Sequence, residues 1–365
     1  MARNVLHVVE SSAPEAGTVA VLLDGLRDAL RKRCIESDVI ALNGSTTAEA
    51  GGLEGNRRPA SWDNEKDKAG LVADADLLHF HGWGHPAGRR LAVEARRAGK
   101  PYVISPLGSL TYGPHRRRTW SERLAGPFRD GRVVRHAAAV TASSNKEADD
   151  LERRRAHAKV HRLPYGITTA EYESNSDARA ASIAKTDVRG MLMLGPLEPA
   201  EGFIPLLRSL EELGAFTDGW NLVVAGREIG DWSRLLGPLI AKKGWTDRIR
   251  FCDASDVTTQ RGLLAEASLL VAPNLHTRCP VSIIQAAAAG VPVIASAYTV
   301  PSALKDVVCV FGTARVEMKI DLRKMLGLSD DERKVMADRA REVVRDRVDW
   351  YTVVEEYVPF YESLM

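Results

Sequence analysis

Three histidines and two glycines stand close together at the end of an apolar run, in the sequence His79-Phe-His81-Gly-Trp-Gly-His85. Alternation along a strand directs His79 into the core and leaves His81 at the carboxyl end, where a neutral imidazole can donate a hydrogen bond to a ligand hydroxyl. No carboxylate follows at metal-ligand spacing, so we expect no metal. His85 has either a structural role or a place on the ligand side.

A turn with one glycine follows the first apolar run, at residues 14–18. Backbone N–H groups at such a strand–helix junction can bind a phosphate or a sugar hydroxyl, which makes Gly17 and Thr18 candidate ligand contacts. A single glycine is also ordinary turn geometry, and that alternative stays open. The turn lacks the G-x-G-x-x-G of dehydrogenases, so we do not expect an NAD-dependent enzyme. We expect no cofactor.

Arginine dominates residues 116–135, where seven arginines, beginning with Arg116 and Arg117, face only Glu122 and Asp130. One interpretation is a solvated helix face. The other is attraction of an anionic acceptor or of an acidic membrane surface, which would make a peripheral membrane contact. Nucleic-acid binding is not expected, because aromatic stacking residues are sparse there.

The composition favours an enzyme-sized globular protein. A chain of 365 residues with 45% apolar residues suits two domains and excludes a disordered chain. The net charge of +2 divides into +6 for residues 1–172 and −4 for the remainder. Four cysteines without a C-x-x-C pair argue against disulfides and zinc, and no spanning helix or signal peptide is evident. We therefore expect a cytoplasmic protein.

Short apolar strands alternate with amphipathic helices and must position these residues. The strands expected in the first half cover residues 4–9, 37–42, 77–81, 101–105, 138–142 and 159–163, and those in the second half cover 190–195, 221–225, 248–252, 269–272 and 292–295. Single helices between strands require parallel, doubly wound sheets. The sequence thus predicts an α/β protein of two Rossmann-like domains facing a cleft, over residues 1–172 and 188–345, with a linker over 173–187. Ligands of such sheets bind at the carboxyl ends of the strands.

The most specific pattern lies at residues 269–295, where a buried strand, a loop and a small-residue helix lead into Gly-Val-Pro-Val-Ile-Ala. This pattern resembles the retaining glycosyltransferases of family 4, which have the GT-B fold and two glutamates before such a helix. Further segments match family motifs in order, at residues 76–82, 101–108, 142–147, 163–167, 193–197 and 222–226. Trp350 and Tyr361 fit the family's C-terminal helix, over residues 346–365, which crosses back to the first domain.

The chain departs from the family where the donor binds. The family holds the donor diphosphate with an Arg and a Lys, and the ribose and sugar with the two glutamates. The corresponding residues here are Pro196, Glu201, Thr277 and Gln285. A glutamate in place of the lysine is expected to repel a diphosphate. Leu107 and Tyr165 replace a usual Arg and a usual Asn.

The resemblance implies metal-independent, retaining transfer of a sugar from a nucleotide-sugar donor to an unidentified acceptor. The more basic first half suggests that this acceptor is anionic. We expect His81 to contact the transferred sugar, and we expect His85, Arg116 and Arg117 to lie on the acceptor side. The expected donor-binding residues are Gly17, Thr18, Gly195, Arg227, Thr277, Arg278 and Gln285. Arg227, after the Gly226 turn, and Arg278, beside Thr277, are candidates for the missing cations, and the alternative for both is an ordinary surface arginine. The alternative is a non-catalytic GT-B scaffold or binding protein that has lost its donor site.

Overall fold

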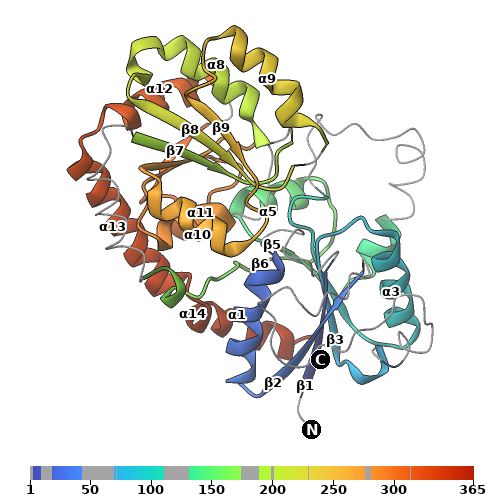
Figure 1. Cartoon of the computed structure of the whole chain (residues 1–365). Helices are drawn as coiled ribbons and strands as arrows, with labels where there is room; N and C mark the ends of the chain where they lie inside the picture. The colour runs from blue at the N-terminus through green and yellow to red at the C-terminus, as the bar shows by residue number, and fades with distance from the viewer. Residues whose placement is uncertain are drawn as a thin grey trace. The chain divides into compact units, whose positions relative to one another are not determined.

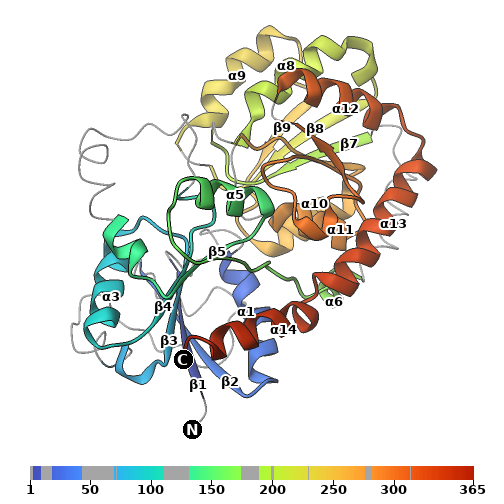
Figure 2. The same cartoon turned by 180° about the vertical axis from the view of Figure 1, so that it is seen from behind.

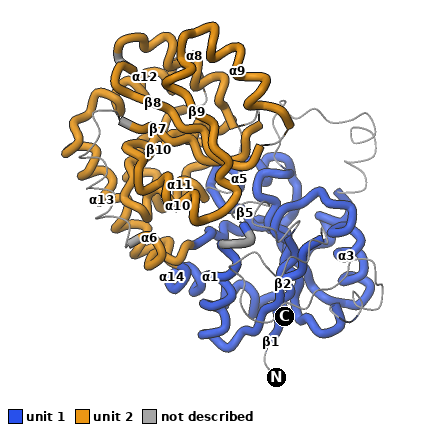
Figure 3. The backbone as a smooth tube through the Cα atoms, in the orientation of Figure 1, with its two compact units in different colours: residues 1–166, 277–279, 350–365 blue, residues 167–276, 280–349 orange. Residues whose placement is uncertain are grey.

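The computed structural model describes residues 3–9, 19–42, 70, 72–110, 131–173, 189–198, 201–228, 230–275, 281–312 and 314–365, and the structural statements below concern these residues. The chain divides into two compact units (Figure 3). Unit 1 comprises residues 1–166, 277–279 and 350–365, and unit 2 comprises residues 167–276 and 280–349.

Unit 1 is built on a parallel sheet with the strand order β2-β1-β3-β4-β5-β6. Its strands are β1 (Arg3–Val9), β2 (Ile35–Ala41), β3 (Leu77–His81), β4 (Tyr102–Ser105), β5 (Ala139–Ala142) and β6 (Val160–Arg162). The helices α1 (Val19–Arg31), α3 (Pro86–Arg97) and α5 (Asn145–Arg153) connect them (Figure 1). The last helix, α14 (Trp350–Glu362), belongs to unit 1 and packs against α1 (Figure 2).

Unit 2 is built on a second parallel sheet, with the order β12-β11-β10-β7-β8-β9. Its strands are β7 (Arg189–Leu194), β8 (Trp220–Ala225), β9 (Ile249–Cys252), β10 (Leu269–Ala272), β11 (Val293–Ser296) and β12 (Cys309–Phe311). Its α-helices are α6 (Ala170–Glu173), α8 (Phe203–Leu213), α9 (Trp232–Lys242), α10 (Val257–Glu266), α11 (Val281–Ala288), α12 (Arg315–Gly327) and α13 (Asp330–Arg347). In both sheets the order reverses beside the first strand, and such a switch point is where open α/β sheets bind ligands.

The predicted fold of two Rossmann-like domains is confirmed, and each expected strand coincides with an observed one to within a few residues. The edge strand β12 was not expected, because a strand of three residues gives too little periodicity to recognise. Val348 and Asp349 separate the end of α13 from the start of α14. Most of the basic stretch 116–135 falls outside the described residues. Among the described helices, none is both long and apolar enough to cross a membrane.

Candidate functional site

Gly195 directly follows strand β7 and Gly226 directly follows strand β8, and the two glycines are in contact. The Gly195 N–H donates to the Ala225 carbonyl, and the Gly226 N–H to the Cys252 carbonyl, each at 3.0 Å. A Cβ at Gly226 would lie 1.9 Å from the Gly195 oxygen, and φ there is +149°, so only glycine fits. The Gly195 N–H already donates within the sheet. Gly195, which we predicted to contact the nucleotide-sugar, could therefore help a ligand only by leaving space where a side chain would otherwise stand.

Glu201 lies at the switch point of unit 2, between β7 and α8. Asn274, just after β10, donates from Nδ2 to Oε2 of Glu201 at 2.5 Å. The same oxygen lies 2.9 Å from where a Cβ on Gly195 would stand. Burial raises the pKa of Glu201 to about 8, against a smaller lowering by the Asn274 hydrogen bond. The neutral acid therefore predominates at pH 7, which corrects the expectation that this residue repels a diphosphate.

Gln285, the predicted ribose contact, lies on α11 and is only 1% exposed. Its Nε2 donates to the Tyr172 hydroxyl at 3.1 Å and to Oε1 of Gln260 at 3.2 Å. Its own Oε1 is buried and has no hydrogen-bond partner among the residues that the structure describes. A buried carbonyl oxygen without a donor is unusual, and it leaves an acceptor whose hydrogen-bond partner the described residues do not supply.

Of the other residues predicted to bind the nucleotide-sugar, the structure describes only Arg227. Arg227 directly follows β8, its side chain is exposed, and its carbonyl accepts from Leu197 N at 2.8 Å, which extends the pairing of β7 and β8. The structure thus brings Gly195 and Arg227 to adjoining strand ends. Residues outside the described part of the chain include Gly17, Thr18, Thr277, Arg278, Arg116 and Arg117.

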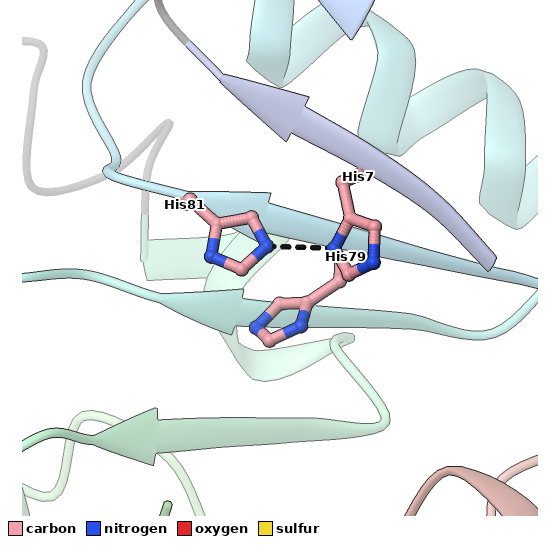
Figure 4. Close-up of side chains that lie close together, drawn as sticks. All are labelled: His7, His79 and His81. Carbon is pink, nitrogen blue, oxygen red and sulfur yellow. Dashed lines mark hydrogen bonds between the residues drawn. The ribbon is translucent and has the colours of Figure 1, made fainter. Parts of the chain in front are cut away.

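Three buried histidines occupy the switch point of unit 1 (Figure 4). His7 on β1 stands in register with His79 on β3, so both rings and that of His81 lie on one face of the sheet. His7 Nδ1 lies 2.9 Å from His81 Nε2. The other nitrogen of His81 lies 2.5 Å from the Tyr165 hydroxyl. His79 bonds to Tyr361 at 2.6 Å and to Ser105 at 2.7 Å.

These histidines are neutral core residues at physiological pH. Burial lowers the pKa of His7 to about 3, with a smaller effect from the charge of Arg27, and it holds the pKa values of His79 and His81 well below the usual range. His81 has a partner on each ring nitrogen, so it would have to exchange one partner for a sugar hydroxyl. Sequence reasoning missed His7. The signal was a polar residue in the middle of an apolar first strand.

Glu147 anchors the turn after β4. Its carboxylate accepts from Gly108 N at 2.5 Å, from Ser143 N at 2.9 Å and from Ser143 Oγ at 3.0 Å. Leu107 in that turn has φ of 52°, a conformation rare outside glycine. We infer that the buried Glu147 holds the turn in this strained shape.

His85 begins helix α3. It occupies the N-cap, and its Nδ1 accepts from Ala87 N at 3.2 Å. Because Nδ1 accepts, the neutral ring carries its proton on Nε2. The half-buried ring therefore has both a structural role and a defined N–H donor near the carboxyl end of β3.

Comparison with known proteins covers both units. Residues 17–166 match the glycosyl transferase 4-like domain, and residues 189–316 match the glycosyl transferases group 1. The chain is 22% identical to a GDP-mannose:cellobiosyl-diphosphopolyprenol alpha-mannosyltransferase of Xanthomonas oryzae pv. oryzae, over 99% of this chain and 97% of that protein. A protein of the same name from Komagataeibacter xylinus is 23% identical over 80% of this chain and 73% of its own length.

Solved structures agree on the fold. Sucrose-phosphate synthase from Thermosynechococcus elongatus has a TM-score of 0.75 at 16% identity, covering 99% of both chains. Anabaena HepE in complex with UDP and glucose has a TM-score of 0.71 at 16% identity, covering 99% of this chain and 100% of that one. A glycosyl transferase 4-like domain is followed along the chain by a glycosyl transferases group 1 domain, and each is built on a Rossmann-like sheet. The chain therefore belongs to the GT-B glycosyltransferases of the family 4 type.

Proposed function

We propose that the protein transfers a sugar from a nucleotide-sugar donor to an acceptor with retention of anomeric configuration. The observation that carries the proposal is the buried carbonyl oxygen of Gln285, which has no partner among the described residues. The family resemblance assigns this position to the donor ribose. The relatives named as GDP-mannose transferases support a donor of this class. Their matches along the chain do not favour a non-catalytic scaffold.

Unit 2 supplies the described residues of the proposed donor site. Gly195 has no side chain to obstruct a ligand, and the Gln285 carbonyl oxygen accepts a hydrogen bond from the ribose. Glu201 stays uncharged at pH 7 because it is buried. Cations for the diphosphate come from Arg227 and Arg278, with Thr277, Gly17 and Thr18 as further contacts. Cations and hydrogen-bonding groups that are already in position stabilise the negative charge that develops on the leaving nucleoside diphosphate. His81 contacts the transferred sugar in exchange for one of its present partners.

The acceptor half belongs to unit 1, which carries the positive charge. Around His136 the charges of Arg96, Arg132 and Arg135 lower the pKa of the ring, with Arg96 contributing most. This cationic field suits an anionic acceptor, contacted by His85, Arg116 and Arg117, and the same basic surface would adjoin an acidic membrane. Sedimentation with anionic and with neutral vesicles tests the membrane contact. Equal sedimentation with both would contradict it.

A nucleotide panel tests the donor. Thermal unfolding is measured with UDP-, GDP- and ADP-sugars, and a ligand at about a hundred times its Kd should stabilise the fold by about 2.7 kcal/mol. NMR of the product with a responsive donor then reports the anomeric configuration. No shift with any nucleotide would overturn the proposal, and an inverted product would overturn the retaining mechanism.

Arg278 is the cation whose loss should weaken donor binding most. We expect Arg278→Ala to raise the donor Kd at least tenfold, because one charge-assisted contact to a phosphate is worth about 1.5–3 kcal/mol. The matched control is Arg234→Ala, which removes an exposed arginine on α9 that pairs with Asp231 three residues before it. Unchanged donor affinity in Arg278→Ala would remove Arg278 from the proposed site.

A further inference from the structure

Gln260 is an amide in the interior of unit 2. It lies on α10, is 6% exposed, and donates from Nε2 to the Ala254 carbonyl at 2.9 Å. Only the nitrogen of an amide can donate to a carbonyl. The Ala254 carbonyl, in the segment between β9 and α10, therefore fixes the Gln260 amide with Oε1 turned toward α11.

The orientation of Gln260 in turn determines that of Gln285. Gln285 Nε2 lies 3.2 Å from Gln260 Oε1. If the Gln285 amide turned over, two carbonyl oxygens would meet at this separation inside a buried network, with no proton between them. The Tyr172 hydroxyl imposes no such choice, because a hydroxyl both donates and accepts. Gln260 is thus the partner that leaves Oε1 of Gln285 open.

We propose that Gln260 is a positioning residue for the donor: it presents the Gln285 carbonyl oxygen as an acceptor for a ribose hydroxyl. The inference rests on the proposed function, because the nucleotide-sugar supplies the hydroxyl. It also gives a reason for a glutamine at position 285. A carboxylate there would face Gln260 Oε1 without a proton between the two oxygens, whereas the amide donates to it.

A double-mutant cycle tests the network without any nucleotide. The variants are Gln260→Met, Gln285→Met and the double variant, all measured by thermal unfolding. If the two amides act as one unit, the double variant loses clearly less melting temperature than the two single losses added together. Additive losses would show that the amides are independent and would overturn the proposal.

A second experiment tests the function of the network. Calorimetry gives the affinities for the nucleoside diphosphate of the responsive donor and for its 2′-deoxy and 3′-deoxy analogues. In the wild type we expect one analogue to bind about tenfold more weakly, as the loss of one hydrogen bond predicts. In Gln260→Met this ratio should fall toward one, because the Gln285 amide can then take either orientation.

Two control variants separate positioning from general damage. Tyr172→Phe removes the other acceptor of Gln285 but leaves Gln260 in place, so the ratio should persist. Ser209→Ala removes a buried hydroxyl on α8 that donates to the Pro205 carbonyl within the same helix, so any loss of stability should leave the ratio unchanged. An unchanged ratio in Gln260→Met overturns the positioning role alone. A wild type that binds no nucleotide overturns the proposed function and this inference together.

Discussion

The switch points of the two sheets bury different polar groups. In unit 1, His7 on β1 meets His81 on β3, and both rings are neutral. In unit 2, Glu201 after β7 meets Asn274 after β10, and the carboxyl is neutral because its pKa is about 8. The same topological position thus holds bases in one unit and an acid in the other, each in its uncharged form.

The difference gives the two units opposite responses to pH. The folded histidines have pKa values below the unfolded value of 6.5, about 3 for His7, so the unfolded state binds more protons between these limits. Their stabilisation is present above pH 6.5 and is lost as the pH falls. Glu201 has a folded pKa of about 8 against 4.5 unfolded, so the folded state binds more protons and stability falls as the pH rises from 4.5 to 8.

The largest expected effect is acid destabilisation of unit 1. Lowering the pH from 7 to 5 should cost on the order of several kcal/mol there, because the unfolded state can protonate three histidines that the folded state keeps neutral. Hydrogen exchange, corrected for its intrinsic pH dependence, should show β1 and β3 opening before β7 and β8. Equal loss in both units would break the comparison.

The next effect concerns the backbone of unit 2. Gly226→Ala should destabilise the protein by about 3 kcal/mol or more, because the new Cβ would lie 1.9 Å from the Gly195 oxygen at a φ of +149°. Gly244→Ala is the control, with φ of +68° and no atom within 4 Å of the new Cβ. Chemical denaturation compares the two. Similar losses would show that backbone conformation alone, rather than the contact, makes Gly226 necessary.

Glu201→Gln sharpens the pH contrast directly. At pH 8 the variant should be more stable than the wild type by about 1–3 kcal/mol, and at pH 4.5 nearly equal to it, because the amide never ionises. Glu212→Gln is the matched control. Hydrogen bonds from Lys319 and Arg315 lower the pKa of Glu212 to about 2, so its replacement should weaken the fold instead. A loss of stability in Glu201→Gln at pH 8 would contradict the neutral acid.

The smallest effect concerns the link between α14 and the histidines. Tyr361→Phe removes the hydroxyl that bonds to His79 Nδ1 at 2.6 Å and should cost about 1 kcal/mol at pH 7. Tyr357→Phe is the control, since its hydroxyl donates to the Pro164 carbonyl at 3.0 Å. Only Tyr361→Phe should alter the acid dependence of unfolding. The same acid dependence in both variants would separate α14 from the histidine network.

Much of the framework was predictable because it depends on local periodicity. The apolar runs at 77–81 and 269–272 became β3 and β10 with the expected bounds. The network behind the candidate site was less predictable. Gln260 is one polar residue in a helical stretch, and nothing nearby in the sequence shows that it will meet Gln285. His7 likewise gains its role from partners more than seventy residues away.

The sequence by itself determined the alternation of strands and helices, the two-domain organisation and the motifs that relate this chain to glycosyltransferases. These features depend on which residues follow one another. The tertiary structure alone decided that Glu201 is neutral and that Gln285 presents its oxygen. A pKa is set by burial and an amide's orientation by its neighbours, and both arise only when Asn274 and Gln260 come into contact with these residues.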